Sequence, residues 1–447
     1  MFGTSGIRGR VGDEVTCELA LSVGRALAAE GYETVVVGRD SRESGELLAD
    51  AVAAGVREGG SDVVRVGMAA TPTIARAVAW VDADAGVSVT ASHNPAPDNG
   101  LKLWTRSGRA FDGDQQAAVA RRVREDDHAL VGAADVGDER RLADAVDRHA
   151  DALEAAVDAD LDGLSVVVDV GNGVGGVTAT VLDRLGADVQ TLNAQPDGSF
   201  PGRPSEPTAE HCGALSALVP AIDADLGIAH DGDADRAMAV AEDGEFLAGD
   251  VLLAIFATNA VEAGDRVAAP LNTSLAVDDA LADEGAALAH TKVGDGFVAE
   301  ATEADGVAFG GEMSGAWIWP AETKCPDGPL AAVKLAALVA SEGSLSELAA
   351  GVDAYPTRRE SVAVANKTAV MERVADAVLS DADADAIDDR DGVRVDTDDG
   401  WFLVRASGTQ PLVRVTAEAR SPERSDALAE RAREHLDDAI AAVQDDR

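Results

Sequence analysis

The chain has 447 residues, of which 81 are acidic and 37 are basic, and its formal net charge is −44. Nucleic acid and anionic membrane surfaces repel such a charge, so we expect neither as a partner. The acidic residues are spread along the whole chain, a pattern typical of proteins that stay soluble in concentrated salt, where the screening length falls to ~3 Å at 1 M. We therefore expect a halophilic, cytoplasmic protein.

Residue types and length bound the architecture. Hydrophobic residues make up 46% of the chain and aromatic residues only 3%, so Val and Ala must fill most of the core. A chain of this length should hold about two to four domains. Three scattered cysteines, Cys17, Cys212 and Cys325, favour neither a disulfide framework nor a zinc site. No apolar run approaches the ~18 residues of a membrane span, and no signal peptide precedes Met1.

Short apolar strands and helices alternate through the first part of the chain. The pattern predicts a strand over 35–39, a helix over 45–58, a strand over 62–66, a helix over 72–80 and a strand over 85–90. Two further stretches repeat this alternation, with strands predicted at 165–169, 188–192, 225–229, 265–270, 287–290 and 306–309. Alternation of this kind is typical of βαβ units, so we expect three related mixed α/β domains.

The pattern changes near Tyr355, beyond which strands follow one another with few helices between them. The predicted elements are strands at 359–365, 392–397, 401–405 and 412–418, a hairpin turn at 398–400 and a last helix at 422–443. These elements predict a smaller α+β domain at the C-terminus, hinged at about 355–360. We expect four domains around one central cleft, with the bounds 1–137, 138–249, 250–355 and 356–447.

The segment Thr90–Pro95 (TASHNP) follows a predicted buried strand, and Pro95 ends strand pairing there. It presents the hydroxyl of Ser92, which could be a nucleophile, a phosphate carrier or a helix N-cap. We expect His93 to orient or hydrogen-bond rather than to bind a metal, because no second His lies at ligand spacing. Lys102, on the strand that follows, is either structural or a proton shuttle or charge neutraliser for Ser92.

A second loop, Asp231–Arg236 (DGDADR), carries three carboxylates at alternate positions. The side chains of Asp231, Asp233 and Asp235 converge if the loop wraps, and hard carboxylate oxygens suit Mg²⁺. A hydroxyl, a hard metal ion and the guanidinium of Arg236 together indicate phosphoryl transfer. In each unit the chemically active loop follows the carboxyl end of the corresponding strand, where open α/β sheets bind ligands. We therefore expect these loops to share one site.

Three further segments are each open to two interpretations. Gly311–Gly315 (GEMSG) could bind paired sugar hydroxyls or hold a buried ion pair. Arg405–Thr409 (RASGT), with Arg414 beyond it, fits a phosphate site of backbone N–H groups and guanidiniums, or an ordinary β-turn. Gly3–Gly9 (GTSGIRG) has a similar composition at a terminus, where a flexible tail is the default. We expect three histidines at the surface: His128, His149 and His211.

These loops stand in the order and at the spacing of the α-D-phosphohexomutase family, which the chain resembles over essentially its whole length. The matching motifs are Thr90–Pro95 with Asn99–Lys102, Asp231–Arg236, Gly311–Gly315 and Arg405–Pro411. The resemblance implies four domains, of which three are related mixed α/β units and the fourth carries a phosphate-binding loop. It also implies an isomerase that transfers a phosphoryl group within a small-molecule sugar phosphate.

The same resemblance assigns roles residue by residue. It implies that Ser92 is carried phosphorylated and that the phosphoserine holds one Mg²⁺ together with Asp231, Asp233 and Asp235. Transfer from the phosphoserine would give a hexose 1,6-bisphosphate, which turns over and returns its other phosphate to Ser92. The implied catalytic residues are Ser92, Arg8, His93, Lys102 and Arg236. The implied substrate-binding residues are Thr4, Ser5, Lys292, Asp295, Glu312, Ser314, Arg405, Ser407, Gly408, Thr409 and Arg414.

The motifs also bear on the sugar. Phe2–Gly9 is similar to family members that act on glucosamine phosphate, and Asn193–Gly198 and Thr291–Asp295 are similar to archaeal members. Glu312–Gly315, however, also resembles members that act on glucose or mannose phosphate. We therefore expect glucosamine phosphate as the preferred substrate, with glucose or mannose phosphate as the alternative.

Two positions depart from the family's pattern. Ala316 stands where a histidine often follows the sugar-binding motif, and Gln410 replaces the usual acid of the phosphate loop. The first departure puts a histidine contact near the reacting hydroxyl in doubt. Two other classes remain as alternatives: a phosphatase that transfers to water, and a catalytically silent sugar-phosphate-binding protein. We expect a monomer or a homodimer.

Overall fold

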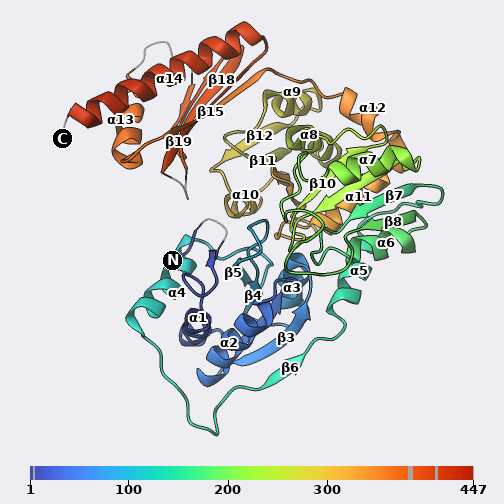
Figure 1. Ribbon diagram of the computed structural model, residues 1–447, viewed down its shortest axis with the longest axis vertical. Coiled ribbons are helices and arrows are strands. Elements are labelled where there is room, and N and C mark those ends of the chain that lie inside the picture. The colour runs from blue at the N-terminus through green and yellow to red at the C-terminus, as the bar shows by residue number, and fades with distance from the viewer. Residues whose placement is uncertain (4–5, 381–385, 408–410, 446–447) are drawn as a thin grey trace.

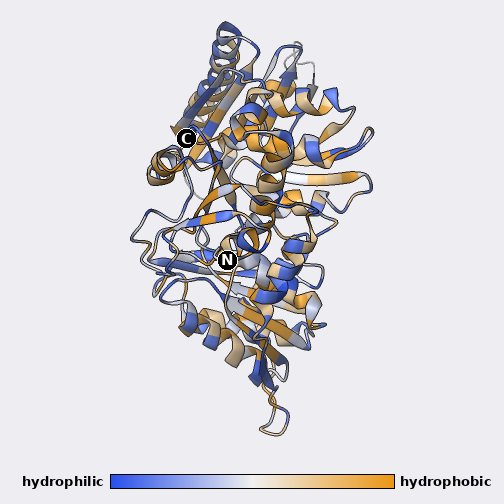
Figure 2. Cartoon of the chain, turned by 90° about the vertical axis from the view of Figure 1, so that its right-hand side faces the viewer, coloured by the Kyte–Doolittle hydropathy of each residue, from blue (hydrophilic) through white to orange (hydrophobic). Residues whose placement is uncertain are grey.

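The computed structural model describes residues 1–3, 6–380, 386–407 and 411–445, which form four β-sheets with helices around them (Figure 1). In this view the first domain lies at the bottom in blue and the fourth at the top left in red. Hydrophilic residues are distributed over all parts of the chain rather than gathered at one end (Figure 2). Within the described ranges, no helix combines the length and the apolar character needed to cross a membrane.

The first domain contains a six-stranded sheet in the order β1-β5-β4-β2-β3-β6. Strand β4 is buried at every residue, because helices cover both faces of the sheet centre and such strands read as continuous apolar runs. The elements are β1 (Ile7–Arg10), α1 (Cys17–Ala29), β2 (Thr34–Arg39), α2 (Gly45–Glu58), β3 (Asp62–Met68), α3 (Thr71–Trp80), β4 (Ala85–Val89), β5 (Asp98–Thr105), α4 (Gly113–Glu125) and β6 (Glu139–Arg141).

The second domain contains a four-stranded sheet in the order β10-β9-β7-β8. Its elements are α5 (Ala145–Ala155), β7 (Ser165–Asp169), α6 (Val177–Arg184), β8 (Asp188–Leu192), α7 (Gly213–Ala221), β9 (Leu226–His230) and β10 (Ala237–Ala241). The third domain contains a four-stranded sheet in the order β12-β11-β13-β14. Its elements are α8 (Gly249–Ala260), β11 (Arg266–Pro270), α9 (Leu275–Asp283), β12 (Ala287–Thr291), α10 (Asp295–Ala301), β13 (Val307–Glu312), β14 (Ala316–Ile318), α11 (Gly328–Glu342) and α12 (Leu345–Ala350).

These three sheets share one topology. The strands β3-β2-β4-β5, β8-β7-β9-β10 and β12-β11-β13-β14 lie in equivalent order, and in each set the first three are parallel and the fourth is antiparallel. The connection between the third and fourth strands is therefore the same structural position three times. It carries Ser92 in the first domain, Asp231–Arg236 in the second and Met313–Gly315 in the third. The predicted class of three related α/β domains is confirmed.

In its described residues, the fourth domain is a smaller antiparallel sheet in the order β15-β19-β18-β17-β16, with two helices. Its elements are β15 (Thr357–Ala363), α13 (Lys367–Leu379), β16 (Ala386–Asp388), β17 (Val393–Thr397), β18 (Gly400–Ala406), β19 (Leu412–Ala419) and α14 (Pro422–Asp445). Thr397 pairs with Gly400, so the predicted hairpin turn is present. This arrangement confirms the predicted α+β C-terminal domain.

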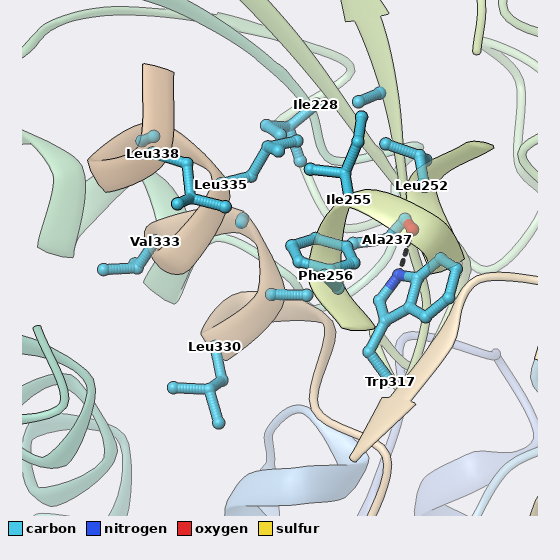
Figure 3. Close-up of a cluster of buried hydrophobic side chains, with 14 of the residues drawn as sticks. Ile228, Ala237, Leu252, Ile255, Phe256, Trp317, Leu330, Val333, Leu335 and Leu338 are labelled. Carbon is cyan, nitrogen blue, oxygen red and sulfur yellow. Dashed lines mark hydrogen bonds between the residues drawn. The ribbon is translucent and has the colours of Figure 1, made fainter. Parts of the chain in front are cut away.

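The second and third domains share one hydrophobic core, in which α11 of the third domain packs against β9 and β10 of the second (Figure 3). Trp317 anchors this junction, because its indole N–H donates to the carbonyl of Ala237 at 2.8 Å. The first and fourth domains also have main cores of their own, in which Val and Ala predominate. Smaller buried clusters link these two domains to their neighbours through Ala145, Cys325 and Leu271. The aspartate loop and the third-domain loop are therefore carried by one packed body.

Several features differ from the sequence analysis, and two of them are instructive. Helix α13 was not predicted, although Val370, Val374 and Val378 recur at helical spacing and are buried against the fourth sheet. The surface prediction for His149 was wrong, since this side chain is fully buried. Its Nε2 lies 3.1 Å from Asp327 Oδ2 and its Nδ1 lies 2.7 Å from the Thr73 hydroxyl, so its polar atoms are satisfied inside the protein.

Candidate active site

Ser92 lies in the turn between β4 and β5, and its side chain is fully buried. Its backbone has a φ of 51°, in the left-handed region that few non-glycine residues adopt. The Ser92 N–H donates to the Thr90 hydroxyl at 2.8 Å, which holds the turn. Ser92 Oγ donates to Oδ2 of Asp231 at 2.6 Å and lies 3.5 Å from His93 Nδ1. The hydroxyl is thus directed at the aspartate loop of the second domain.

Asp231, Asp233 and Asp235 come from the loop between β9 and β10, and all three are buried. Ala234, with a φ of 56°, lets the loop wrap so that one oxygen from each carboxylate lies within 4.8 Å of the others. Within the described chain, Oδ1 of Asp233 and Oδ1 of Asp235 are buried without a hydrogen-bond partner. Burial, followed by the charges of Asp233 and Asp235, raises the pKa of Asp231 well above its usual range. The cluster therefore fits a hard divalent cation, which would use these oxygens and balance their charge.

Lys102 on β5 is a buried cation that contacts this cluster. Its Nζ donates to Oδ2 of Asp233 at 3.0 Å and also to Asp235. The same oxygen of Asp233 accepts from the Thr71 hydroxyl at 2.7 Å. Burial acts to lower the pKa of Lys102, but the carboxylates of Asp233 and Asp235 outweigh it and raise that pKa above its usual range. Lys102 is therefore protonated in this arrangement.

His93 lies beside the Ser92 hydroxyl, and the charges of Arg8 and Arg236 act on His93. Burial, followed by the charges of Arg236 and Arg8, lowers the pKa of His93 to about 2, so its imidazole is neutral at physiological pH. Arg8 lies on β1, and its buried Nε has no hydrogen-bond partner among the residues that the structure describes. A neutral imidazole and two guanidiniums are thus available where an anionic group on Ser92 would lie.

Glu312 is the last residue of β13, and Ser314 lies in the turn between β13 and β14. Glu312 pairs with Ala316 across the hairpin, and Ala316 forms a further bridge with Arg236. Ala316 therefore lies between its cross-strand neighbours Glu312 and Arg236, and its methyl group is buried. Burial, followed by the charge of Asp295, raises the pKa of Glu312 to about 7, although Arg236 opposes this. The third-domain turn therefore meets the aspartate loop.

Lys292 and Asp295 lie in the connection from β12 to α10 and at the start of that helix. Lys292 Nζ lies 5.6 Å from the ring centre of Phe297. The charge of Asp295 acts on Glu312, and so does the charge of Arg405 from the fourth domain. These electrostatic effects place predicted substrate-binding residues of two domains near one another.

Arg405 and Arg414 pair directly across β18 and β19, so their side chains share one face of the sheet. Like charges in this position repel each other, and an anion between them would relieve the repulsion. Arg405 Nη1 lies 3.3 Å from Asp391 Oδ2, which offsets part of this charge. Ser407 is buried, and its carbonyl accepts from the ammonium of Lys367. Four predicted residues lie outside the described residues: Thr4, Ser5, Gly408 and Thr409.

Sequence reasoning missed several buried residues that support the site. Thr71 contacts Asp233, and Arg42 binds the carbonyl of Ser92 at 2.8 Å. A signal for Arg42 was present, because it follows the end of a predicted strand, where the other active loops also lie. Ser205 also contacts the Ser92 carbonyl, at 2.8 Å, but nothing in the segment around it indicates that contact.

Comparison with known proteins agrees with this arrangement. Four models of the phosphoglucomutase/phosphomannomutase family match the chain, covering alpha/beta/alpha domain I at residues 1–129, domain II at 143–244, domain III at 248–355 and the C-terminal domain at 361–435. A probable phosphoglucosamine mutase from Methanopyrus kandleri is 45% identical over 95% of each chain. A protein of the same description from Methanosarcina acetivorans is 44% identical over 98% of this chain and 99% of its own.

Among solved structures, a phosphoglucomutase/phosphomannomutase family protein from Burkholderia thailandensis is 28% identical, with a TM-score of 0.87 over 98% of each chain. The fold and the relatives together define an isomerase, an intramolecular phosphotransferase. The chain belongs to the phosphoglucomutase/phosphomannomutase family of phosphohexomutases.

Proposed function

We propose that this chain interconverts hexose 6-phosphate and hexose 1-phosphate through a phosphorylated Ser92 and a hexose 1,6-bisphosphate. The observation that carries the proposal is the 2.6 Å hydrogen bond from Ser92 Oγ to Asp231, within a buried cluster of three carboxylates. A serine hydroxyl is a poor nucleophile on its own, and it becomes useful where nearby charges stabilise its phosphorylated form.

One Mg²⁺ per site is part of this proposal. Asp231, Asp233 and Asp235 would hold it together with the phosphoserine, because hard carboxylate oxygens are its preferred ligands. The unpartnered Oδ1 atoms of Asp233 and Asp235, counted within the described chain, support this fit. A bound cation would neutralise charge on the phosphoryl group as it transfers.

The residues of the chain would supply the remaining chemistry. As a sugar hydroxyl oxygen bonds to phosphorus, the bond from phosphorus to Ser92 Oγ breaks. The sugar hydroxyl loses its proton in this step, and Ser92 Oγ gains one. In the contacts described here Lys102 is protonated, so it serves as a fixed positive charge or as a proton donor. To accept the hydroxyl proton it must first lose its own proton, and loss of the contacts to Asp233 and Asp235 would favour that step. Arg236 and Arg8 would stabilise negative charge, with Arg8 also available for proton transfer, and neutral His93 would orient the serine.

We propose glucosamine phosphate as the preferred substrate. Both archaeal relatives reported above carry the description probable phosphoglucosamine mutase, and they match this chain over nearly its full length. Glu312 and Ser314 would bind sugar hydroxyls, and Lys292 and Asp295 would lie beside them. Arg405 and Arg414, which share a sheet face, would bind the non-reacting phosphate with Ser407. Glucose or mannose phosphate remains the second candidate, because the third-domain motif also resembles that branch.

The test is a comparison of the native protein with Ser92→Ala on glucosamine, glucose and mannose 6-phosphates. We expect the native protein to convert a substrate without net release of phosphate and intact mass to show one phosphate on Ser92. Ser92→Ala should lose well over about 100-fold in kcat, because it removes the covalent step. Stoichiometric phosphate release would indicate a phosphatase instead, and a protein with no phosphate and no turnover would indicate a silent sugar-phosphate-binding protein.

We place the enzyme in the cytoplasm of a salt-rich cell, as a monomer or a homodimer. The support is the net charge of −44, which concentrated salt would screen. Activity measured across a series of KCl concentrations tests the salt-rich setting. Sedimentation in the same series tests the oligomeric state. Full activity and unchanged stability in dilute buffer would argue against the salt-rich setting.

A further inference from the structure

Two buried aspartate–arginine pairs occupy equivalent places in the first and second domains. Asp40 follows β2 and Asp169 ends β7, and these are the corresponding strands of the two sheets. Nε of Arg42 donates to Asp40 at 3.1 Å, and Nε of Arg203 donates to Asp169 at 2.6 Å. The side chains of both pairs are almost completely inaccessible to solvent. A buried ion pair is costly unless its remaining donors and acceptors are used, so the partners of the two guanidiniums show what each pair does.

The remaining N–H groups of Arg42 donate to the loop that carries Ser92. Its Nη1 donates to the carbonyls of Pro95 and Asp98 at 2.8 and 2.9 Å. Its Nη2 donates to the carbonyls of Ser92 and Asn94 at 2.8 and 2.7 Å. One planar side chain thus fixes four carbonyls of one loop, including that of the residue with the left-handed backbone.

Arg203 makes equivalent contacts with backbone carbonyls next to the aspartate loop. Its Nη2 donates at 2.5 Å to the carbonyl of His230, the residue immediately before Asp231. Its Nη1 donates to the carbonyls of Pro204 and Ser205 at 3.1 and 3.3 Å. The same guanidinium therefore holds the start of the aspartate loop and the segment that contains Ser205.

Ser205 joins the two loops. Its hydroxyl donates to the carbonyl of Ser92 at 2.8 Å and accepts from the N–H of Gly232 at 3.0 Å, and the residue is buried. Gly232 lies between Asp231 and Asp233, and a Cβ there would come within 2.7 Å of Ser205 Oγ and 3.0 Å of the Ser92 carbonyl. Only a glycine lets the two backbones approach this closely.

We propose that Ser205 is a positioning residue for phosphoryl transfer, which holds the backbone of the Ser92 loop at a fixed distance from the aspartate loop. The inference rests on the proposed function. The direct contact between Ser92 Oγ and Asp231 cannot persist unchanged when Ser92 is phosphorylated, because the donated proton is replaced by the phosphoryl group. The Ser205 contacts involve a carbonyl and an N–H of the backbone, so they are independent of that cycle. Ser205 therefore maintains the geometry of the two loops in both states of the enzyme.

The test uses Ser205→Ala, Ser205→Thr and a matched control, Ser199→Ala. Ser199 lies in the same segment and is exposed, and its hydroxyl donates only to Asp197 among the described residues. We expect Ser205→Ala to lower kcat about 10- to 100-fold on the preferred sugar phosphate, because small misplacements of reacting groups have effects of this size. KM should stay within about threefold, since the predicted sugar and phosphate contacts lie elsewhere. Ser205→Thr, which keeps the hydroxyl, should stay near native activity.

A second readout follows the transfer itself. Phospho-enzyme that carries a labelled phosphate on Ser92 is mixed with one equivalent of glucosamine 6-phosphate or glucose 6-phosphate, and transfer of the label from Ser92 to the sugar is followed over time. The single-turnover rate of Ser205→Ala should fall by the same factor as kcat, while circular dichroism and thermal unfolding show a folded protein. This measurement separates transfer from substrate binding and product release.

Several outcomes would overturn the inference. Native kcat in Ser205→Ala, or a rise in KM with kcat unchanged, would show that the hydroxyl does not position the reacting groups. A loss of activity that Ser205→Thr shares and that accompanies a broad unfolding transition would indicate a purely structural role. Failure of the proposed function is distinguishable, because Ser92→Ala would then keep its turnover. An inactive Ser92→Ala beside a fully active Ser205→Ala would remove this inference alone.

Discussion

The loops of the first two domains and those of the last two are held in different ways. In the first domain Arg42 donates to the carbonyl of Ser92, and in the second domain Arg203 donates to the carbonyl of His230. Each of these two loops is thus held by an arginine of its own domain. In the third domain the carbonyl of Leu271, just after β11, accepts instead from Arg394 of the fourth domain. The N–H of Val293 likewise donates to Asp391 of the fourth domain at 2.9 Å.

This difference separates the site into two halves. The half that would carry out transfer contains Ser92, Lys102 and the three aspartates, and it is assembled from buried contacts between the first two domains. The half that would bind the sugar phosphate depends on how the third and fourth domains meet. Transfer requires reacting atoms to be placed within fractions of an ångström, whereas a substrate that must turn over requires contacts that can be released and remade. Variants in the two halves should therefore differ in kinetic signature.

Metal removal should give the largest effect on the transfer half. Exhaustive chelation, or Asp233→Ala, should lower kcat by about 10³-fold or more, because a cation contributes several kcal/mol of charge stabilisation at the transferring phosphoryl group. Binding of Mg²⁺, measured by calorimetry, should be lost in Asp233→Ala and kept in the control Asp243→Ala, whose side chain is exposed. Full activity of thoroughly chelated protein, or metal retained by Asp233→Ala, would contradict the assignment of the cluster.

Lys102→Ala should affect the same half with a different signature. Removing this buried ammonium should lower kcat about 100-fold or more and change KM far less, since proton transfer and charge neutralisation act on the reaction rather than on binding. Lys324→Ala is a suitable control, because that lysine pairs with Glu303 at the protein surface. A variant that binds substrate poorly but reacts at the native rate when saturated would move Lys102 to the binding half.

Arg405→Ala should show the opposite signature. If Arg405 and Arg414 bind the non-reacting phosphate, losing one guanidinium should raise KM about tenfold to 100-fold, the effect of one or two hydrogen bonds to a charged group. Saturating substrate should restore most of kcat. Arg433→Ala on α14 removes an arginine of the same domain that pairs with Asp437, and it should leave both constants near native values. A fall of kcat in Arg405→Ala as large as that in Lys102→Ala would contradict the proposed division of the site.

The same division marks what could be read from the sequence. The repeated strand–helix alternation predicted the three α/β domains, and α2 begins and ends where its apolar spacing predicted. Ser92 and the aspartate loop were also found, because chemically distinct residues cluster at strand ends. Contacts between distant segments left no such pattern. Ser205 lies in a Pro-rich loop whose composition indicates only a turn. Its proposed role depends on a contact with Ser92, which is 113 residues away in the sequence.

His149 illustrates the same limit inside the core. A lone histidine in a helix with charged residues nearby predicts a surface position, because the sequence does not show that Asp327 and Thr73 will lie beside it. Helix α13 was missed for another reason. Its valines have modest helix propensity, and their spacing was outweighed by the surrounding strands. Local sequence patterns thus predicted helices, strands and loops. The contacts between residues distant in the sequence, which support the site, became visible only in the folded structure.

The pH dependence of the binding half should report on Glu312. Burial and Asp295 raise the pKa of this carboxyl to about 7, so it is largely protonated below that pH and charged above it. A carboxylate accepts hydrogen bonds from sugar hydroxyls better than the protonated acid does, so kcat/KM should rise by up to about tenfold as pH increases through 7. Glu312→Gln should remove this step. The substrate phosphate titrates equally with both proteins, so the ratio of the two profiles isolates Glu312, and a ratio independent of pH would rule out its titration as the cause.

The smallest effect is expected at Ala316, where both halves of the site meet. This residue pairs with Glu312 and bridges to Arg236, so a larger side chain there would enter the space between a carboxylate and a guanidinium. Ala316→His should nevertheless change kcat by less than about tenfold in either direction, because the site already works without an imidazole at this position. The choice of sugar should be equally resistant: native protein and Ala316→His should both prefer glucosamine phosphate in kcat/KM. A native preference for glucose or mannose phosphate above about tenfold, equivalent to about 1.4 kcal/mol of transition-state binding, would overturn the proposed sugar and leave the mutase reaction standing. A switch of preference in Ala316→His alone would instead identify this methyl group as the specificity determinant.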